Sequence, residues 1–142
     1  MNITFTIPGA AVGKGRPKFA RRGDFVHTYT PEKTASYENL VKLYSQMAMK
    51  KAKMSITDRP VNVSIVVRAP IPKSFTKKKK MDAAANILKP TSKPDLDNVA
   101  KGILDAMNGI VFHDDKQVVA LSIMKMYNVE PYTTVFVKEE IE

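Results

Sequence analysis

Residues 93–105 of the chain read KPDLDNVAKGILD and combine a helix signal with an unusual group of charges. Pro94 biases the residue before it toward an extended conformation, and Asp97 is a favoured residue for a helix N-cap. Apolar residues then recur at helical spacing as far as Met107, and the Asn-Gly pair that follows is a common helix exit. The stretch therefore predicts a helix from Asp97 to about Met107 with one buried face.

Four carboxylates and one lysine lie along this part of the chain: Asp95, Asp97, Lys101, Asp114 and Asp115. Clustered carboxylates repel one another unless protons or cations compensate, and Mg²⁺ or Mn²⁺ prefers oxygen ligands. Two such ions can activate water and stabilise the leaving oxygen of a phosphodiester, and a nearby lysine can stabilise the transition state. On spacing alone, a helix cap with an Asp97–Lys101 surface pair and ordinary turn residues at 114–115 is a competing interpretation.

Composition favours a polyanionic partner. The 142 residues include 23 Lys and Arg against 14 Asp and Glu, a formal net charge of +9. Nucleic acid is a better candidate than an acidic membrane surface, because the sequence shows no basic amphipathic helix. The absence of cysteine excludes disulfides and thiolate zinc sites. With no signal-peptide pattern and no long apolar run, we expect a cytoplasmic protein without a membrane partner.

Other segments predict a sheet and a second main helix. Strands are expected at Asn2–Ile7, Asp24–Tyr29, Val61–Ala69, Ile110–Phe112, Gln117–Tyr127 and Tyr132–Lys138. The second of these is expected to pair with the first as a hairpin, and the third, apolar on both faces, to be central. A helix should begin at Thr30-Pro31-Glu32, with an apolar stripe of Tyr37, Leu40, Val41, Tyr44, Met47 and Ala48. The tail 139–142 should fray. We therefore expect one α/β (α+β) domain over residues 1–142, with a mixed sheet packed against two main helices.

Two basic segments flank the candidate site. Residues 12–23 read VGKGRPKFARRG and predict an irregular basic loop, because glycine and proline disfavour regular structure; they contain Lys14, Arg16, Lys18, Arg21 and Arg22. They are not a P-loop, because three residues instead of four separate Gly9 from Gly13, and Gly15 stands where Ser or Thr is required. Residues 70–94 form a second basic segment with a short helix expected at 76–86, and they contain Lys77, Lys78, Lys79, Lys80 and Lys93. Either segment can be a solvated surface or a contact to a DNA backbone, and the aromatic Phe19 favours DNA for the first.

Two other enzyme classes that use paired aspartates fit poorly. An aspartyl phosphatase places its first Asp at the end of a buried strand, which the prolines of residues 88–94 exclude. A nucleotide-sugar transferase needs a preceding nucleotide-binding half that the chain lacks. His27 and His113 are isolated and are expected to be non-catalytic.

The order of the charged residues resembles the active-site block of the RusA-type Holliday-junction resolvases, which occur in bacteria and often in prophages. The similar residues are Asp95-Leu96-Asp97-Asn98, Lys101, Leu104-Asp105-Ala106 and Asp114-Asp115-Lys116-Gln117-Val118. The segments 13–18 and 29–34 also resemble the phage-type branch of that family, whereas residues 50–89 carry little of the resemblance.

This resemblance implies a RusA-like fold and a homodimer that uses magnesium, or manganese, to cut four-way DNA by paired symmetric nicks in recombination and repair. It assigns catalysis to Asp95, Asp97, Lys101 and Asp115, and metal binding to Asp95, Asp97, Asp114 and Asp115. The turn between Met107 and Phe112 is shorter than in the family, which affects the placement of Asp114 relative to Asp115. The alternatives are a non-cleaving module that binds branched DNA, against which the intact acidic set argues, and a metal nuclease for flap or fork DNA.

Overall fold

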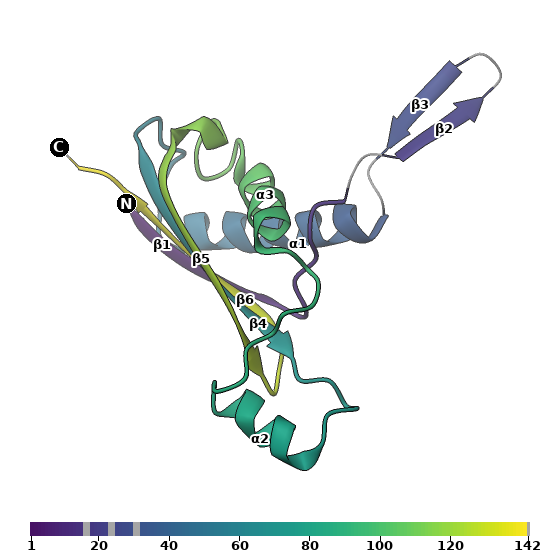
Figure 1. Ribbon diagram of the computed structural model, residues 1–142. Coiled ribbons are helices and arrows are strands. Elements are labelled where there is room, and N and C mark those ends of the chain that lie inside the picture. The colour runs from purple at the N-terminus through teal and green to yellow at the C-terminus, as the bar shows by residue number, and fades with distance from the viewer. Residues whose placement is uncertain (16–17, 23–24, 30–31, 142) are drawn as a thin grey trace.

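Four strands form the central sheet of the computed structural model, which describes residues 1–15, 18–22, 25–29 and 32–141, with only the backbone for 18–22 and 25–29. They are β1 (Asn2–Pro8), β4 (Val61–Pro70), β5 (Val118–Asn128) and β6 (Tyr132–Glu139), in the spatial order β1-β6-β4-β5. β4 pairs with β5 in parallel, whereas β1–β6 and β4–β6 are antiparallel (Figure 1). The sheet is therefore mixed, and Val61–Pro70 is central, as the sequence predicts.

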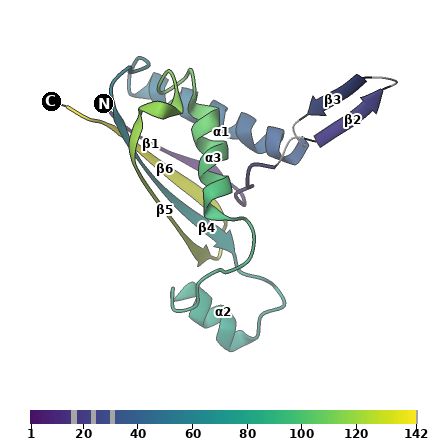
Figure 2. The same ribbon diagram turned by 45° about the horizontal axis from the view of Figure 1, so that its top comes forward.

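The helices α1 (Glu32–Lys51) and α3 (Leu96–Met107) lie on the same face of this sheet (Figures 1 and 2). Alternate residues of the strands point into the layer between the sheet and the two helices. Phe5, Ile65 and Val135 are neighbours in this layer and are almost fully buried. Val99, Ile103 and Met107 of α3 complete this core, as the helical spacing predicts. The opposite face of the sheet carries exposed residues such as Ser64 and Phe136, so β4 is fully buried on one face only.

Two smaller elements project from this framework. The helix α2 (Lys77–Ala84) lies beyond the ends of β4 and β5, and the hairpin of β2 (Lys18–Arg22) and β3 (Phe25–Tyr29) extends past the start of α1 (Figure 2). Thr76 caps α2 by accepting a hydrogen bond from the Lys79 N–H at 3.2 Å, which confirms the predicted short helix. The α+β class is confirmed. No helix in the described part of the chain is both long and apolar enough to cross a membrane.

The expected pairing of the strand at 24–29 is wrong. β3 pairs antiparallel with β2, inside a segment that was expected to be an irregular loop, whereas β1 pairs with β6. The local sequence favours a hairpin between strands that are neighbours along the chain. Pairing with β6 instead buries the apolar face of β1 against the core, which stabilises this arrangement. The expected start of α1 at Thr30 and Pro31 lies outside the described residues.

Three further expectations are corrected: one about the buried face of α1, one about a strand at 110–112 and one about the C-terminal end. Leu40 and Met47 are 37% and 55% exposed, because α1 turns Tyr37, Val41, Ser45 and Met49 toward the core instead. Residues 110–112 form a turn with isolated bridges and not a strand. Glu139 does not fray: its N–H donates to the Met1 carbonyl oxygen at 2.9 Å, and its carboxylate accepts a hydrogen bond from Thr57.

Candidate active site on helix α3

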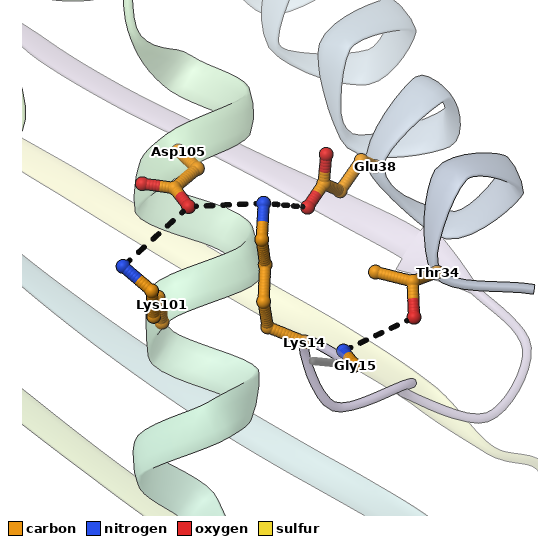
Figure 3. Close-up of polar contacts among 6 residues, drawn as sticks. All are labelled: Lys14, Gly15, Thr34, Glu38, Lys101 and Asp105. Atoms are coloured by element: carbon orange, nitrogen blue, oxygen red, sulfur yellow. Dashed lines mark hydrogen bonds and ion pairs between the residues drawn. The ribbon is translucent and has the colours of Figure 1, made fainter. Parts of the chain in front are cut away.

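Two lysines converge on one carboxylate of α3, that of Asp105 (Figure 3). The Lys14 Nζ lies 3.1 Å from the Asp105 Oδ2 and 2.6 Å from the Glu38 Oε1 of α1. The Lys101 Nζ lies 3.9 Å from the same Asp105 oxygen, one helical turn away. The Lys101 side chain is 64% exposed, whereas those of Lys14, Glu38 and Asp105 are mostly covered. Lys101 thus faces solvent at the edge of a partly buried charge network.

The segment before β2 brings Lys14 to this place because it lies directly on α3. The Lys14 N–H donates to the Asn98 carbonyl oxygen at 3.0 Å, and the Gly15 N–H donates to the Thr34 Oγ1 at 3.2 Å. A Cβ at Gly13 would stand 3.2 Å from that of Asn98, so only glycine allows this approach without a shift. Burial lowers the pKa of the Lys14 ammonium, but hydrogen bonds and charge from Glu38 and Asp105 outweigh it and raise that pKa overall.

The turn after α3 presents Asp114 and Asp115. The Asp114 carboxylate accepts from the Lys116 N–H at 2.9 Å, and the Asp114 N–H donates to the Gln117 Oε1 at 2.9 Å. The Gln117 Nε2 in turn donates to the carbonyl oxygens of Thr57 and Arg59, both at 3.0 Å. This is a capping box that also anchors the turn to a distant loop. The turn therefore has a fixed geometry, and the glutamine of the D-D-x-Q pattern has a structural role.

The two carboxyls of this turn have different protonation tendencies. Burial, together with the charges of Asp114 and Asp105, raises the pKa of the Asp115 carboxyl. The backbone N–H of Lys116 lowers the pKa of Asp114. Neighbouring carboxylates disfavour the ionised form of such a carboxyl, and a bound cation stabilises that form because it offsets the repulsion between the negative charges.

Asp95 and Asp97 lie at the other end of α3. Asp95, not Asp97, is the N-cap residue, although its side chain makes no capping hydrogen bond; Asp97 lies in the first turn and is exposed. Lys125 of β5 fixes the chain before them, because its Nζ donates to the carbonyl oxygens of Ser92 at 2.8 Å and Pro94 at 3.2 Å. Both carboxylates are therefore presented to solvent by an anchored segment.

The four predicted metal ligands do not meet around one point. Asp115 lies beside Asp105, and at 1.5 Å per residue the eight residues from Asp97 to Asp105 span about 12 Å of helix. Among the described residues, no three Asp, Glu, His or Cys side chains are close enough to hold one ion. The oxygen donors suit magnesium in kind, but one chain with this arrangement does not form a complete site for it.

The predicted DNA-contacting cations lie in different settings. Lys14 belongs to the network around Asp105. Arg16 lies outside the described residues, and for Lys18, Arg21 and Arg22 only the backbone of β2 is described. Lys93 and all four lysines of α2 are exposed.

Sequence reasoning assigned no role to Asp105, Glu38 or Lys125. Asp105 carried two signals, since it follows Lys101 by four residues on the same helix face and belongs to the block that resembles the family. Glu38 and Lys125 carried none, because their positions depend on how α1 and β5 pack against α3. His113 is exposed beside the site.

Two comparisons show which known proteins the chain is similar to. Residues 8–138 match the family model described as endodeoxyribonuclease RusA. The chain is also 39% identical over 139 residues to an uncharacterized protein of Bacillus subtilis (strain 168), YqaN, and the match covers 96% of each chain. Both matches include α3 and the turn that follows it.

Proposed function

The chain belongs to the RusA endodeoxyribonuclease family, and from this premise we propose that it is a magnesium-dependent endonuclease that resolves four-way DNA junctions. One observation carries the proposal: the start of α3 presents exposed carboxylates and Lys101, and the turn after the helix presents two half-buried carboxylates, in a chain with net charge +9. A phosphodiester is the substrate that needs both a cationic surface and local carboxylates.

The residues of the site suggest a division of labour. Lys101, exposed at the edge of the network, is suited to contact a phosphate oxygen and to stabilise the charge that develops during cleavage. Asp95 and Asp97 at one end of α3, and Asp114 and Asp115 beyond the other end, offer two separate pairs of oxygen donors of the kind that magnesium takes; a bound ion would supply charge neutralisation and an activated water. Asp105 keeps the Lys101 ammonium near the helix. Lys14, which also pairs with Glu38, offsets the negative charge of Asp105.

A direct test compares substrates. End-labelled four-way junction, fork, flap and linear duplex are incubated with the protein, with magnesium, with manganese, and with EDTA. We expect cleavage of the junction only with a divalent ion, and little cleavage of the linear duplex. If fork or flap DNA is cut faster than the four-way junction, the protein is a nuclease that prefers another kind of branched DNA. If the junction is bound but no substrate is cut, the protein is a junction-binding module.

A homodimer is the expected assembly, because resolving a junction with approximate two-fold symmetry requires two equivalent cuts. The edge strand β5 offers a surface for it: Val119, Leu121 and Met124 are 58%, 46% and 50% exposed. Light scattering should give about twice the 15.8 kDa of one chain. A cruciform plasmid should be linearised by paired nicks. A monomer both free and on DNA, or a plasmid that is nicked but never linearised, would contradict the paired-nick mechanism.

The lysines of α2 are expected to contribute to binding by neutralising DNA phosphates. In the triple variant Lys77→Gln, Lys78→Gln and Lys80→Gln, the slope of log affinity against log salt should decrease by about 0.9 for each phosphate that is no longer neutralised. Lys79 is retained because its Nζ lies over the Phe75 ring, 5.5 Å from the centroid. The matched control changes the exposed Lys42, Lys50 and Lys51 of α1. Equal slopes in the two variants would make α2 an ordinary solvated helix.

A further inference from the structure

A cavity of about 550 Å³ lies beside the start of α3. Most of its lining comes from three parts of the chain: residues 10–14, the end of β4, and the segment before α3, which includes Asp95. Single residues of α1, α3 and β5, namely Lys33, Asn98 and Lys125, complete it. The volume falls within the range of about 300–1,000 Å³ that is usual for sites of small organic ligands. The cavity is therefore large enough for one organic group and opens directly beside a candidate ligand of the metal.

The lining combines an apolar interior with several cations. Ala11, Val67, Ala69, Pro90 and Pro94 supply apolar surface. Four lysines also contribute to the lining: Lys14, Lys33, Lys93 and Lys125. A ligand that suits such a site has a flat, largely apolar body and anionic groups attached to it. A nucleotide with the phosphates on either side of it has this chemistry.

The cavity is built and not an accidental gap between mobile segments. One wall is fixed by the Lys14 N–H, which donates to the Asn98 carbonyl oxygen at 3.0 Å. Another is fixed by the Lys125 Nζ, which donates to the carbonyl oxygens of Ser92 and Pro94. Because both anchors involve the chain next to Asp95, a group held in the cavity has a defined position relative to that carboxylate.

We propose that this cavity receives one unpaired nucleotide of the DNA substrate, next to the phosphodiester that is cut. A paired base does not fit, since its partner and its stacked neighbours would have to enter with it; a base at a branch point is less costly to extrude. The Asn98 amide, with both a donor and an acceptor, contacts the base edge and sets a base preference. This inference rests on the proposed function, because it names the part of the substrate that the site selects.

The experiment uses four-way junctions with 2-aminopurine at successive positions around the crossover, bound in EDTA so that nothing is cut. Fluorescence should rise at one position per cleaved strand, because the base leaves the stack and none of the described lining residues is aromatic. The filling variants Ala10→Phe and Ala69→Leu should lose at least half of that rise. Gln46→Leu, at an exposed position of α1 away from the cavity, should behave like the wild type.

A second readout follows the cut itself. With magnesium, an abasic residue at the responding position should slow the wild type about tenfold, which corresponds to about 1.4 kcal/mol, and should slow Ala69→Leu no further. The inference would be overturned if the fluorescence rises at no position with the wild type. It would also be overturned if both filling variants give the same rise as the wild type, even if junctions are cleaved. Absence of cleavage by the wild type would instead count against the proposed function, and the fluorescence result would still decide whether a base enters the cavity.

Discussion

Replacing Asp97 by asparagine is expected to abolish cleavage of a four-way junction while leaving its binding unchanged or tighter. Asp97 is exposed in the first turn of α3, so the substitution changes charge without disturbing the core. Loss of a carboxylate that holds a divalent ion removes several kcal/mol of charge stabilisation, a factor of about 10³ in rate. Removal of a negative charge near phosphate should at the same time favour binding.

The measurement is a single-turnover cleavage rate together with junction affinity in EDTA. The control is Glu130→Gln, the same loss of one charge at an exposed position between β5 and β6. It should cut at the rate of the wild type. If Asp97→Asn also cuts at the rate of the wild type in magnesium, the carboxylates of α3 are not the active site. If Asp97→Asn neither binds nor cuts the junction, the loss of cleavage reflects lost binding and not a slower chemical step.

Much of the fold could be predicted because its signals are local. The apolar spacing of α3, the alternation in β4 and the capping residue of α2 each depend on neighbours within a few residues. The stripe on α1 illustrates the limit. Its apolar residues cover more of the helix than the sheet and α3 can bury, and the packing, which buries Ser45 and exposes Leu40 and Met47, is not encoded in the spacing.

The site shows the same division. The sequence order predicts roles for Asp95, Asp97, Lys101 and the turn at 114–115, because these residues form a recognisable pattern along the chain, and their roles remain a prediction. It placed Lys14 among the DNA contacts, whereas the structure pairs that lysine with Glu38 and Asp105. Whether a cation in a basic segment faces solvent or a carboxylate depends on contacts between segments more than 20 residues apart, which composition does not contain.

The second large effect is expected at Asp105, whose carboxylate is shared by two lysines. Asp105→Asn should lower the cleavage rate about 10- to 100-fold, the usual cost of losing a partner that orients a group of a metal site. The Lys101 ammonium then loses the charge that lies 3.9 Å away, while Lys14 keeps Glu38 at 2.6 Å. The substrate affinity should change little, because Asp105 is less exposed than Lys101 and is already paired.

Glu38→Gln is the matched control, since Glu38 contacts Lys14 but makes no ion pair with Lys101 in the described chain. It should cost much less activity than Asp105→Asn while removing the same charge from the same network. Single-turnover rates and junction affinities in EDTA separate the two effects, and urea unfolding shows whether either variant is less stable. If the two variants lose activity equally, the network acts only by holding Lys14 in place; a larger loss for Asp105→Asn, at equal stability, assigns to Asp105 the positioning of Lys101 at the phosphate.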